Sequence, residues 1–147
     1  MLTHLISVAE DLGLSVVWRK RAKRGGFHEG SRTIRLNPDQ SDRVTISVLT
    51  HEIAHAVFGD TYTPYGPARA KQERRADEWA ALYLITPERY AAAEERRGVH
   101  AAALAFELGV TIELVEGFQR LLQRHGDVTY VSARMGAGQW RHRSGVA

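Results

Sequence analysis

The sequence has no cysteine and no apolar run close to the ~20 residues that span a bilayer. Without cysteine, disulfides, thiolate metal ligands and cysteine nucleophiles are excluded, so a transition-metal site must use His, Asp or Glu. The N-terminal segment lacks a basic start and a small-residue cleavage site, and it carries Glu10 and Asp11. We therefore expect a cytoplasmic protein that does not enter the membrane.

The rest of the composition is that of one packed domain with a small appendage. Of 147 residues, 44% are hydrophobic and 25% are charged, which excludes disordered, collagen-like and low-complexity chains. The net charge is +3, and arginine far outnumbers lysine among the 20 basic residues. This mild positive charge is weak evidence for a nucleic-acid partner. The function must be sought in local motifs.

The segment up to Pro38 predicts a helix followed by a small antiparallel sheet. An apolar stripe at helical spacing covers residues 2–12, and Gly13 follows as a helix stop. β-branched and aromatic residues favour a strand at Ser15–Trp18, and polar–apolar alternation favours another at Thr33–Leu36. We expect Thr33–Leu36 to be an exposed edge on which an extended substrate could align.

A run of basic residues, Arg19–Arg24, follows the first predicted strand. Five of its six residues are Arg or Lys. Such a run is typical of a patch for nucleic acid or an acidic partner, but it is also typical of a solvated hairpin loop. Because no aromatic residue is interleaved with the charges, we favour the loop.

The remaining sequence predicts a series of helices. The first, Val44–Phe58, has Ser41 or Asp42 as its N-cap and Gly59 as its stop. Its core stripe is expected to consist of Ile46, Leu49, Ile53 and Val57. Later helices are expected between Gly66 and Pro87, from Pro87 to Arg97 behind a Thr86 N-cap, and at about 99–108 and 112–124.

The first of these helices contains an HExxH motif, His51-Glu52-Ile53-Ala54-His55. Residues four apart lie on one helical face, so both imidazoles can reach a single Zn²⁺, and Glu52 can take a proton from water that the metal activates. The flanking residues are apolar, which predicts a buried helix. Buried His and Glu side chains need polar partners, and one metal ion would supply a partner to all three. The alternative, a helix that carries two surface histidines, does not fit these apolar neighbours. The motif therefore predicts a zinc site with Glu52 as general base.

A catalytic zinc usually has three protein ligands, and the helix predicted after Gly66 offers the third. Glu73 lies 18 residues after His55, enough for the second helix to fold back across the first. The helical stripe that contains Glu73 continues through small residues, which would allow the two helices to approach each other closely. Asp77, one turn further, is placed to accept the free N–H of a ligand imidazole. Glu78 is a rival ligand, but it lies off this stripe.

Two segments, THEIAHAVFGD (Thr50–Asp60) and ERRADEWAALYLITPE (Glu73–Glu88), resemble the ImmA/IrrE metallo-endopeptidases, which are gluzincin-like zinc peptidases. The resemblance extends back to TIRLNPDQSD and forward to ALAFELGVTIELV, so it covers roughly residues 10–120. It implies zinc ligands and a general base at the positions that the motif already indicates: His51, His55 and Glu73 as ligands, and Glu52 as base. It also implies a role in phage, mobile-element or stress regulation through cleavage of helix-turn-helix repressors.

The sequence differs from the family pattern at one position, and one catalytic group is not identified. Ala54 stands where glycine is common in the family, and alanine suits a helix. Peptide hydrolysis also needs a donor for the developing oxyanion besides the metal. Tyr62, Tyr65, His28 and His125 are candidates for that donor, and none of them is assigned here.

The segment Ala105–Val115 supports a second function class. It has the small residue, the turn glycine and the apolar spacing of a helix-turn-helix, as in a DNA-binding regulator whose zinc is only structural. Glu113 and Glu116 oppose this interpretation, because both would face DNA phosphates. A third class, a module that docks a repressor without cleaving it, does not require the general base Glu52.

We therefore expect an α+β fold with three parts. Residues 1–87 are a zincin-like, mostly helical peptidase core with the small sheet, residues 88–125 are a helical, helix-turn-helix-like subdomain, and residues 126–147 are a tail that is poorly ordered at its end. The expected activity is zinc-dependent endopeptidase cleavage of a helix-turn-helix repressor, with one Zn²⁺ per chain. Specific DNA binding is not expected. The alternative is a DNA-binding or repressor-docking regulator with a structural zinc.

Overall fold

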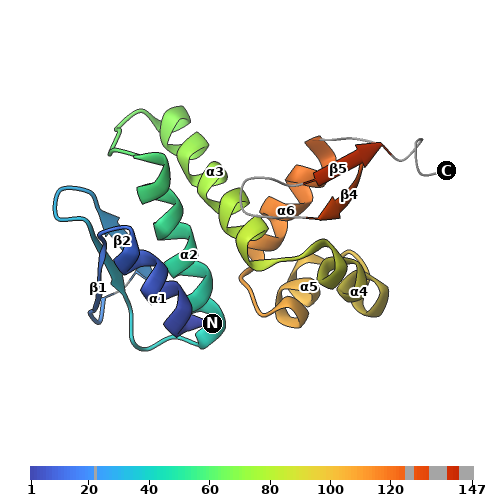
Figure 1. Cartoon of the computed structure of the whole chain (residues 1–147), viewed down its shortest axis with the longest axis horizontal. Helices are drawn as coiled ribbons and strands as arrows, with labels where there is room; N and C mark the ends of the chain where they lie inside the picture. Colours follow the sequence, from blue (N-terminus) through green and yellow to red (C-terminus); the bar gives the residue numbers. More distant parts are fainter. Residues whose placement is uncertain (22, 125–127, 133–138, 143–147) are drawn as a thin grey trace. The chain divides into compact units, whose positions relative to one another are not determined.

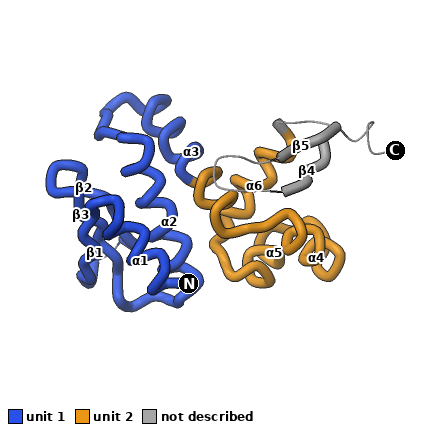
Figure 2. Tube along the Cα trace, viewed as in Figure 1, with its two compact units in different colours: residues 1–76 blue, residues 77–147 orange. Residues whose placement is uncertain are grey.

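The computed structural model of the chain describes residues 1–21, 23–124, 128–132 and 139–142 (Figure 1). They belong to two compact units, residues 1–76 and 77–147 (Figure 2). The helices and strands, in chain order, are α1 (Leu2–Asp11), β1 (Ser15–Trp18), β2 (Gly25–His28), β3 (Thr33–Leu36), α2 (Asp42–Phe58), α3 (Gly66–Leu84), α4 (Pro87–Arg97), α5 (Ala101–Leu108), α6 (Ile112–Arg124), β4 (Val128–Ser132) and β5 (Gln139–His142). The described chain is mostly helical with a small sheet near the N-terminus, which confirms the expected α+β class.

The sheet of the first unit differs from the expected one in two respects. Its strand order is β1-β3-β2, so Thr33–Leu36 is the central strand rather than an exposed edge. β3 pairs antiparallel with β2 but parallel with β1, so the sheet is mixed. The physical reason is burial: Ile34 and Leu36 are fully buried, and the central position gives these two side chains neighbours on both sides.

The core of the first unit lies between this sheet and the helices α1 and α2. α1 packs against β1 and α2, and α2 packs against β2 and β3. Leu5 of α1 and Leu49 and Ile53 of α2 are at most 1% exposed. Apolar side chains from two helices therefore cover one face of the sheet, and α2 is held firmly beneath β2 and β3.

Helix α2 has the predicted N-cap, Ser41, and the predicted end, but it begins at Asp42, two residues before the predicted Val44. The side chain of Ser41 accepts a hydrogen bond from the backbone N–H of Val44 at 3.4 Å, and Gly59 terminates the helix in the left-handed conformation with φ of 65°. Of the predicted core stripe, Leu49 and Ile53 are buried and Ile46 is half-buried, but Val57 is 48% exposed, so the prediction is wrong at its last member. The last turn of α2 lies at the surface, where the guanidinium of Arg75 covers the ring of Phe58.

Helix α3 runs from the first unit into the second, where α4 packs against α5 and α5 against α6. Thr86 caps α4 by accepting a hydrogen bond from the backbone N–H of Arg89, as expected. Tyr90 and Phe118 form the centre of this unit, with ring centroids 4.6 Å apart. Gly117 allows α6 to lie against α3, since a Cβ there would be 3.2 Å from the backbone of Asp77.

Part of the C-terminal prediction lies outside the described residues. β4 and β5 pair antiparallel, and the sequence did not predict this ribbon. Residues 143–147, the end of the expected tail, and His125 are not among the described residues. The two compact units divide inside α3, between residues 76 and 77. The sequence analysis instead ends the peptidase core at residue 87, and this division by function stays a prediction.

None of the described helices is long and apolar enough to cross a membrane. The cytoplasmic location stays a prediction from the sequence.

Candidate metal centre

Helix α2 carries two histidines on one face, four residues apart. The rings of His51 and His55 meet edge to face with centroids 4.7 Å apart, and their Nε2 atoms are 3.0 Å apart. His55 and the intervening Glu52 are each 9% exposed, because this part of α2 lies within the packed first unit. The helix therefore places three polar side chains where water alone does not satisfy them.

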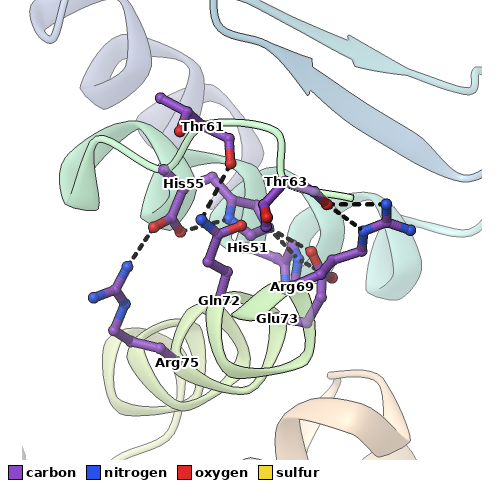
Figure 3. Close-up of polar contacts among 9 residues, drawn as sticks. His51, His55, Thr61, Thr63, Arg69, Gln72, Glu73 and Arg75 are labelled. Carbon is purple, nitrogen blue, oxygen red and sulfur yellow. Dashed lines mark hydrogen bonds and ion pairs between the residues drawn. The ribbon is translucent and has the colours of Figure 1, made fainter. Parts of the chain in front are cut away.

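Glu73 of α3 brings the third set of ligand atoms to the two histidines (Figure 3). Its carboxylate oxygens lie 3.2 Å from Nε2 of His51 and 3.1 Å from Nε2 of His55. Ligand atoms of the three residues lie within 4.8 Å of one another, and the group could hold a metal ion. The structure thus brings together His51, His55 and Glu73, the three ligands that the sequence predicts.

The spacing of these atoms fits a tetrahedral ion. Zinc bonds of about 2.0–2.1 Å imply ligand atoms roughly 3.3–3.4 Å apart at the corners of a tetrahedron. The observed separations of 3.0 Å between the two Nε2 atoms and 3.1–3.2 Å to the carboxylate are only slightly shorter. Two imidazoles and one carboxylate are also a ligand set that suits Zn²⁺ and leaves a fourth position for water. The residues therefore fit a catalytic metal.

Asp60 contacts the candidate site, and the sequence analysis did not identify it. Nδ1 of His55 donates a hydrogen bond to Oδ2 of Asp60 at 2.9 Å, and Arg75 donates to Oδ1 of the same carboxylate. A proton held on Nδ1 leaves the lone pair of Nε2 for a metal. The signal in the sequence is the helix stop: Gly59 turns the chain back, so that the next side chain reaches the last turn of α2.

The loop after α2 is fastened to α3 by side chains of α3 itself. Gln72 donates to the backbone oxygen of Thr61 at 3.1 Å, and Arg69 donates to that of Thr63 at 3.0 and 3.2 Å (Figure 3). Arg69 also stacks over the ring of Tyr62, 5.1 Å from its centroid. These bonds lie within one turn of Glu73, so they fix its position opposite the histidines.

The electrostatics of the site favour positive charge between the ligands. Hydrogen bonds with His51 and His55 hold the pKa of Glu73 far below its usual value. Burial lowers the pKa of His55, but hydrogen bonds to Glu73 and Asp60 outweigh burial and leave that pKa raised. Burial raises the pKa of Glu52, although both histidines oppose the shift. A buried carboxylate with a raised pKa is a stronger base than an exposed one.

A cleft of about 610 Å³ opens beside these residues and is lined by β2 and its following turn, by α2, by the loop 60–63 and by α3. Glu52, His55 and Glu73 all contribute to its surface. Among the candidates for oxyanion donor, His28 and Tyr62 line the cleft and Tyr65 does not. The general base predicted from the motif therefore faces the same space as His55 and Glu73.

Two predicted residues of α3 belong to the second unit. Glu78, the rival ligand, forms an ion pair with Arg120 at 3.3 Å. Asp77, proposed to orient a ligand imidazole, stays a prediction. For His55, the carboxylate that contacts Nδ1 is Asp60, so at this histidine the orienting role belongs to the loop after α2.

Two histidines on one buried helix, closed by a glutamate of the next helix and bordered by a cleft, define a metallopeptidase-type centre. The family model for the IrrE N-terminal-like domain, Peptidase M78, matches residues 5–117, and the chain belongs to this family. No curated protein and no solved structure is significantly similar to the chain. The family membership confirms the resemblance to ImmA/IrrE peptidases.

Proposed function

We propose that this protein is a zinc-dependent endopeptidase with one Zn²⁺ per chain. The observation that carries the proposal is the convergence of His51, His55 and Glu73 on one point, with Glu52 on the wall of the same cleft. Membership of a peptidase family supports it independently. A site that only stabilised the fold would not need an open cleft or a buried base beside the ligands.

The residues divide the chemical work between them. Zinc held by the three ligands would supply the Lewis acid that activates water and polarises the scissile carbonyl. Glu52 accepts the proton of the attacking water and delivers it to the leaving amine. Asp60 keeps the proton of His55 on Nδ1, so that Nε2 is available to the metal.

The substrate is proposed to align on β2. The sequence suggested β3 for this role, but β3 is central, whereas β2 is an edge of the sheet and lines the cleft. An extended peptide that pairs with the free edge of β2 would gain main-chain hydrogen bonds and pass over Glu52 and the ligands. Pairing along an edge strand leaves the peptide free to continue on either side of the cleaved bond, as an endopeptidase requires.

The proposed target is a helix-turn-helix repressor in phage, mobile-element or stress regulation. This part rests on the resemblance to ImmA/IrrE peptidases. The alternative is a DNA-binding regulator with a structural zinc. It is supported by the helical hairpin of α5 and α6, in which Gly109 follows α5 in the left-handed conformation. However, Glu113 and Glu116 are exposed on α6, and carboxylates there would repel phosphates. Proteolysis is therefore the function that we propose.

The test combines metal analysis with one substitution. The purified protein should contain about one zinc per chain. Glu52→Gln should retain zinc and fold but should lose roughly 10²–10⁴-fold in hydrolysis, because the amide cannot act as a base. On co-expression with a repressor encoded beside its gene, fragments should appear with the wild type only. No zinc uptake, or equal cleavage by Glu52→Gln, would contradict the proposal, and tight binding to one operator at physiological salt would favour the regulator.

A further inference from the structure

The face of the sheet away from α1 and α2 carries a second groove. Paired residues of neighbouring strands point to the same side, and the register pairs Val17 and Gly26 with Arg35, and His28 with Thr33. These five residues line a groove of about 370 Å³. It is separate from the buried face of Ile34 and Leu36, because successive residues of β3 point to opposite sides.

The surroundings of this groove are strongly basic. Between residues 19 and 35 the sequence has seven lysines and arginines and a single acidic residue, Glu29. Arg19 and Arg21 line the groove and are exposed, and among the described residues neither side chain forms an ion pair or a hydrogen bond. By contrast, Lys20 is paired with Asp39 at 2.7 Å. Arg19 and Arg21 are therefore available to an anionic partner.

The basic groove and the catalytic cleft share one strand. Gly26, Phe27 and His28 of β2 contribute to the lining of both. β2 is an edge strand, so a chain that leaves the cleft can pass over it onto the basic face without crossing the core. The two sites therefore suit one extended ligand better than two unrelated ligands.

We propose that this groove is an exosite that binds an acidic segment of the polypeptide substrate, on one side of the bond that lies in the cleft. The proposal rests on the proposed endopeptidase function for the identity of the ligand as a polypeptide. The shared strand favours a polypeptide over a nucleic acid, since the neighbouring cleft is built for peptide. The basic run also lacks interleaved aromatic residues on which bases would stack.

The direct test is binding, measured apart from hydrolysis. A fluorescein-labelled peptide rich in Glu and Asp is titrated with the full-length Glu52→Gln protein, and the same peptide with Gln and Asn serves as the neutral probe. The acidic peptide should bind more tightly, and its affinity should fall as salt rises, because exposed charges are screened within about 8–10 Å at physiological ionic strength. Equal affinity for both probes would overturn the exosite.

A pair of charge-matched variants locates the site. Arg19→Glu with Arg21→Glu should weaken binding of the acidic peptide by roughly tenfold or more. Lys71→Glu with Arg74→Glu changes the net charge equally at exposed positions of α3 outside the groove and should leave the affinity unchanged. If both double variants lose affinity equally, the effect is one of net charge and the groove is excluded.

Two competitors separate this site from the other possibilities. Acetohydroxamate, which binds catalytic zinc, should not displace the acidic peptide, and displacement would place the peptide in the cleft instead. A short duplex DNA of equal charge should bind more weakly than the peptide, and tighter DNA binding would replace the exosite with a nucleic-acid surface. A protein that binds the peptide at this groove but cleaves nothing would overturn the proposed function and leave the groove an acidic-peptide site.

Discussion

The imidazole of His55 is held at both of its nitrogens. Glu73 faces Nε2 at 3.1 Å, and Asp60 accepts a hydrogen bond from Nδ1 at 2.9 Å. Asp60 is in turn held by Arg75, whose guanidinium also lies 4.2 Å from the ring centroid of Phe58. This chain of contacts runs from the surface of α3 to a proposed metal ligand. It fixes the ring orientation before any ion binds.

We therefore expect Asp60→Asn to weaken zinc binding by about 10–100-fold, the usual cost of removing a carboxylate that orients a ligand histidine. The variant should fold, since asparagine has nearly the same shape. Competition against a fluorescent zinc chelator measures the affinity. Arg75→Met is the control, because it keeps the Asp60 contact to His55 and an apolar cover over Phe58, and its loss should be smaller. A larger loss for Arg75→Met would show that the cation, rather than the carboxylate, governs the site.

Glu73→Ala should affect zinc binding differently from Asp60→Asn. It removes a ligand atom rather than an orienting group, so zinc should be lost during purification instead of binding more weakly. Asp77→Asn, whose role is still a prediction from the sequence, should resemble Asp60→Asn if it orients the other histidine. Measuring zinc content and affinity for the three variants distinguishes ligands from positioning residues. Retention of stoichiometric zinc by Glu73→Ala would exclude Glu73 as a ligand.

Tyr90 should make the stability of the second unit depend on pH in the alkaline range. Burial, with a further contribution from Glu94, raises the pKa of Tyr90 to about 12, although a hydrogen bond with Gln119 opposes the shift. Because the folded-state pKa lies above the unfolded value near 10, this contribution to stability is fully present below pH ~10 and is lost as pH rises through ~12. Urea unfolding between about pH 9 and 12 should show this fall, and Tyr90→Phe should flatten it. An unchanged pH dependence in Tyr90→Phe would assign the fall to other groups.

At the scale of the elements, β2 packs closely on α2 and also lines the cleft. A Cβ at Gly25 would collide with a methyl group of Val48 and would lie 2.9 Å from the backbone oxygen of Arg35. At Gly26 the nearest atom would be the Nη2 atom of Arg35, at an ordinary 3.5 Å. Two adjacent glycines of one strand therefore differ sharply in the space around them.

Gly25→Ala should destabilise the protein by about 1–3 kcal/mol, the cost of overpacking a tight contact. It should also reduce cleavage, because β2 must move away from α2 and from Glu52. Gly26→Ala is the matched control and should leave the free energy of unfolding within about 0.5 kcal/mol of the wild type. Urea denaturation measures both. Equal stability of the two variants would mean that β2 is not packed tightly on α2.

Most helices and strands could be predicted from local signals. The pairing of the strands could not, because it depends on residues far apart in the sequence. Ser41, Gly59 and Thr86 act through neighbours within a few residues, so the ends of α2 and the start of α4 could be read from the chain. The parallel pairing of β1 with β3 joins residues 18 positions apart across an intervening strand, and no local pattern encodes it. Alternation in Thr33–Leu36 indicates a strand but not its place in the sheet.

The candidate site divides in the same way. The histidines and Glu52 share one helical turn, so their geometry follows from the 3.6-residue period alone. Glu73 was found because its stripe of small residues predicts close approach of a second helix. Asp60 was missed because its contact with His55 depends on the left-handed turn at Gly59, and a turn does not show which way the next side chain points.

At the scale of the whole molecule, all three proposed metal ligands belong to the first of the two compact units. Zinc stabilises only conformations that keep its ligands together. At a free concentration 100 times the dissociation constant this amounts to about 2.7 kcal/mol. Opening of the first unit separates the ligands and loses this free energy. Opening confined to α4, α5 and α6 leaves the ligands in place.

Zinc should therefore protect the two units unequally. In hydrogen exchange followed by mass spectrometry, amides of α2 and β3 should exchange more slowly when zinc is added, whereas those of α5 and α6 should be unchanged. Glu73→Ala is the control, since it should show no zinc-dependent protection anywhere. Equal slowing in α5 and α6 would contradict the expectation. It would mean that the two units open together, because only joint opening makes amides of the second unit depend on an ion held by the first.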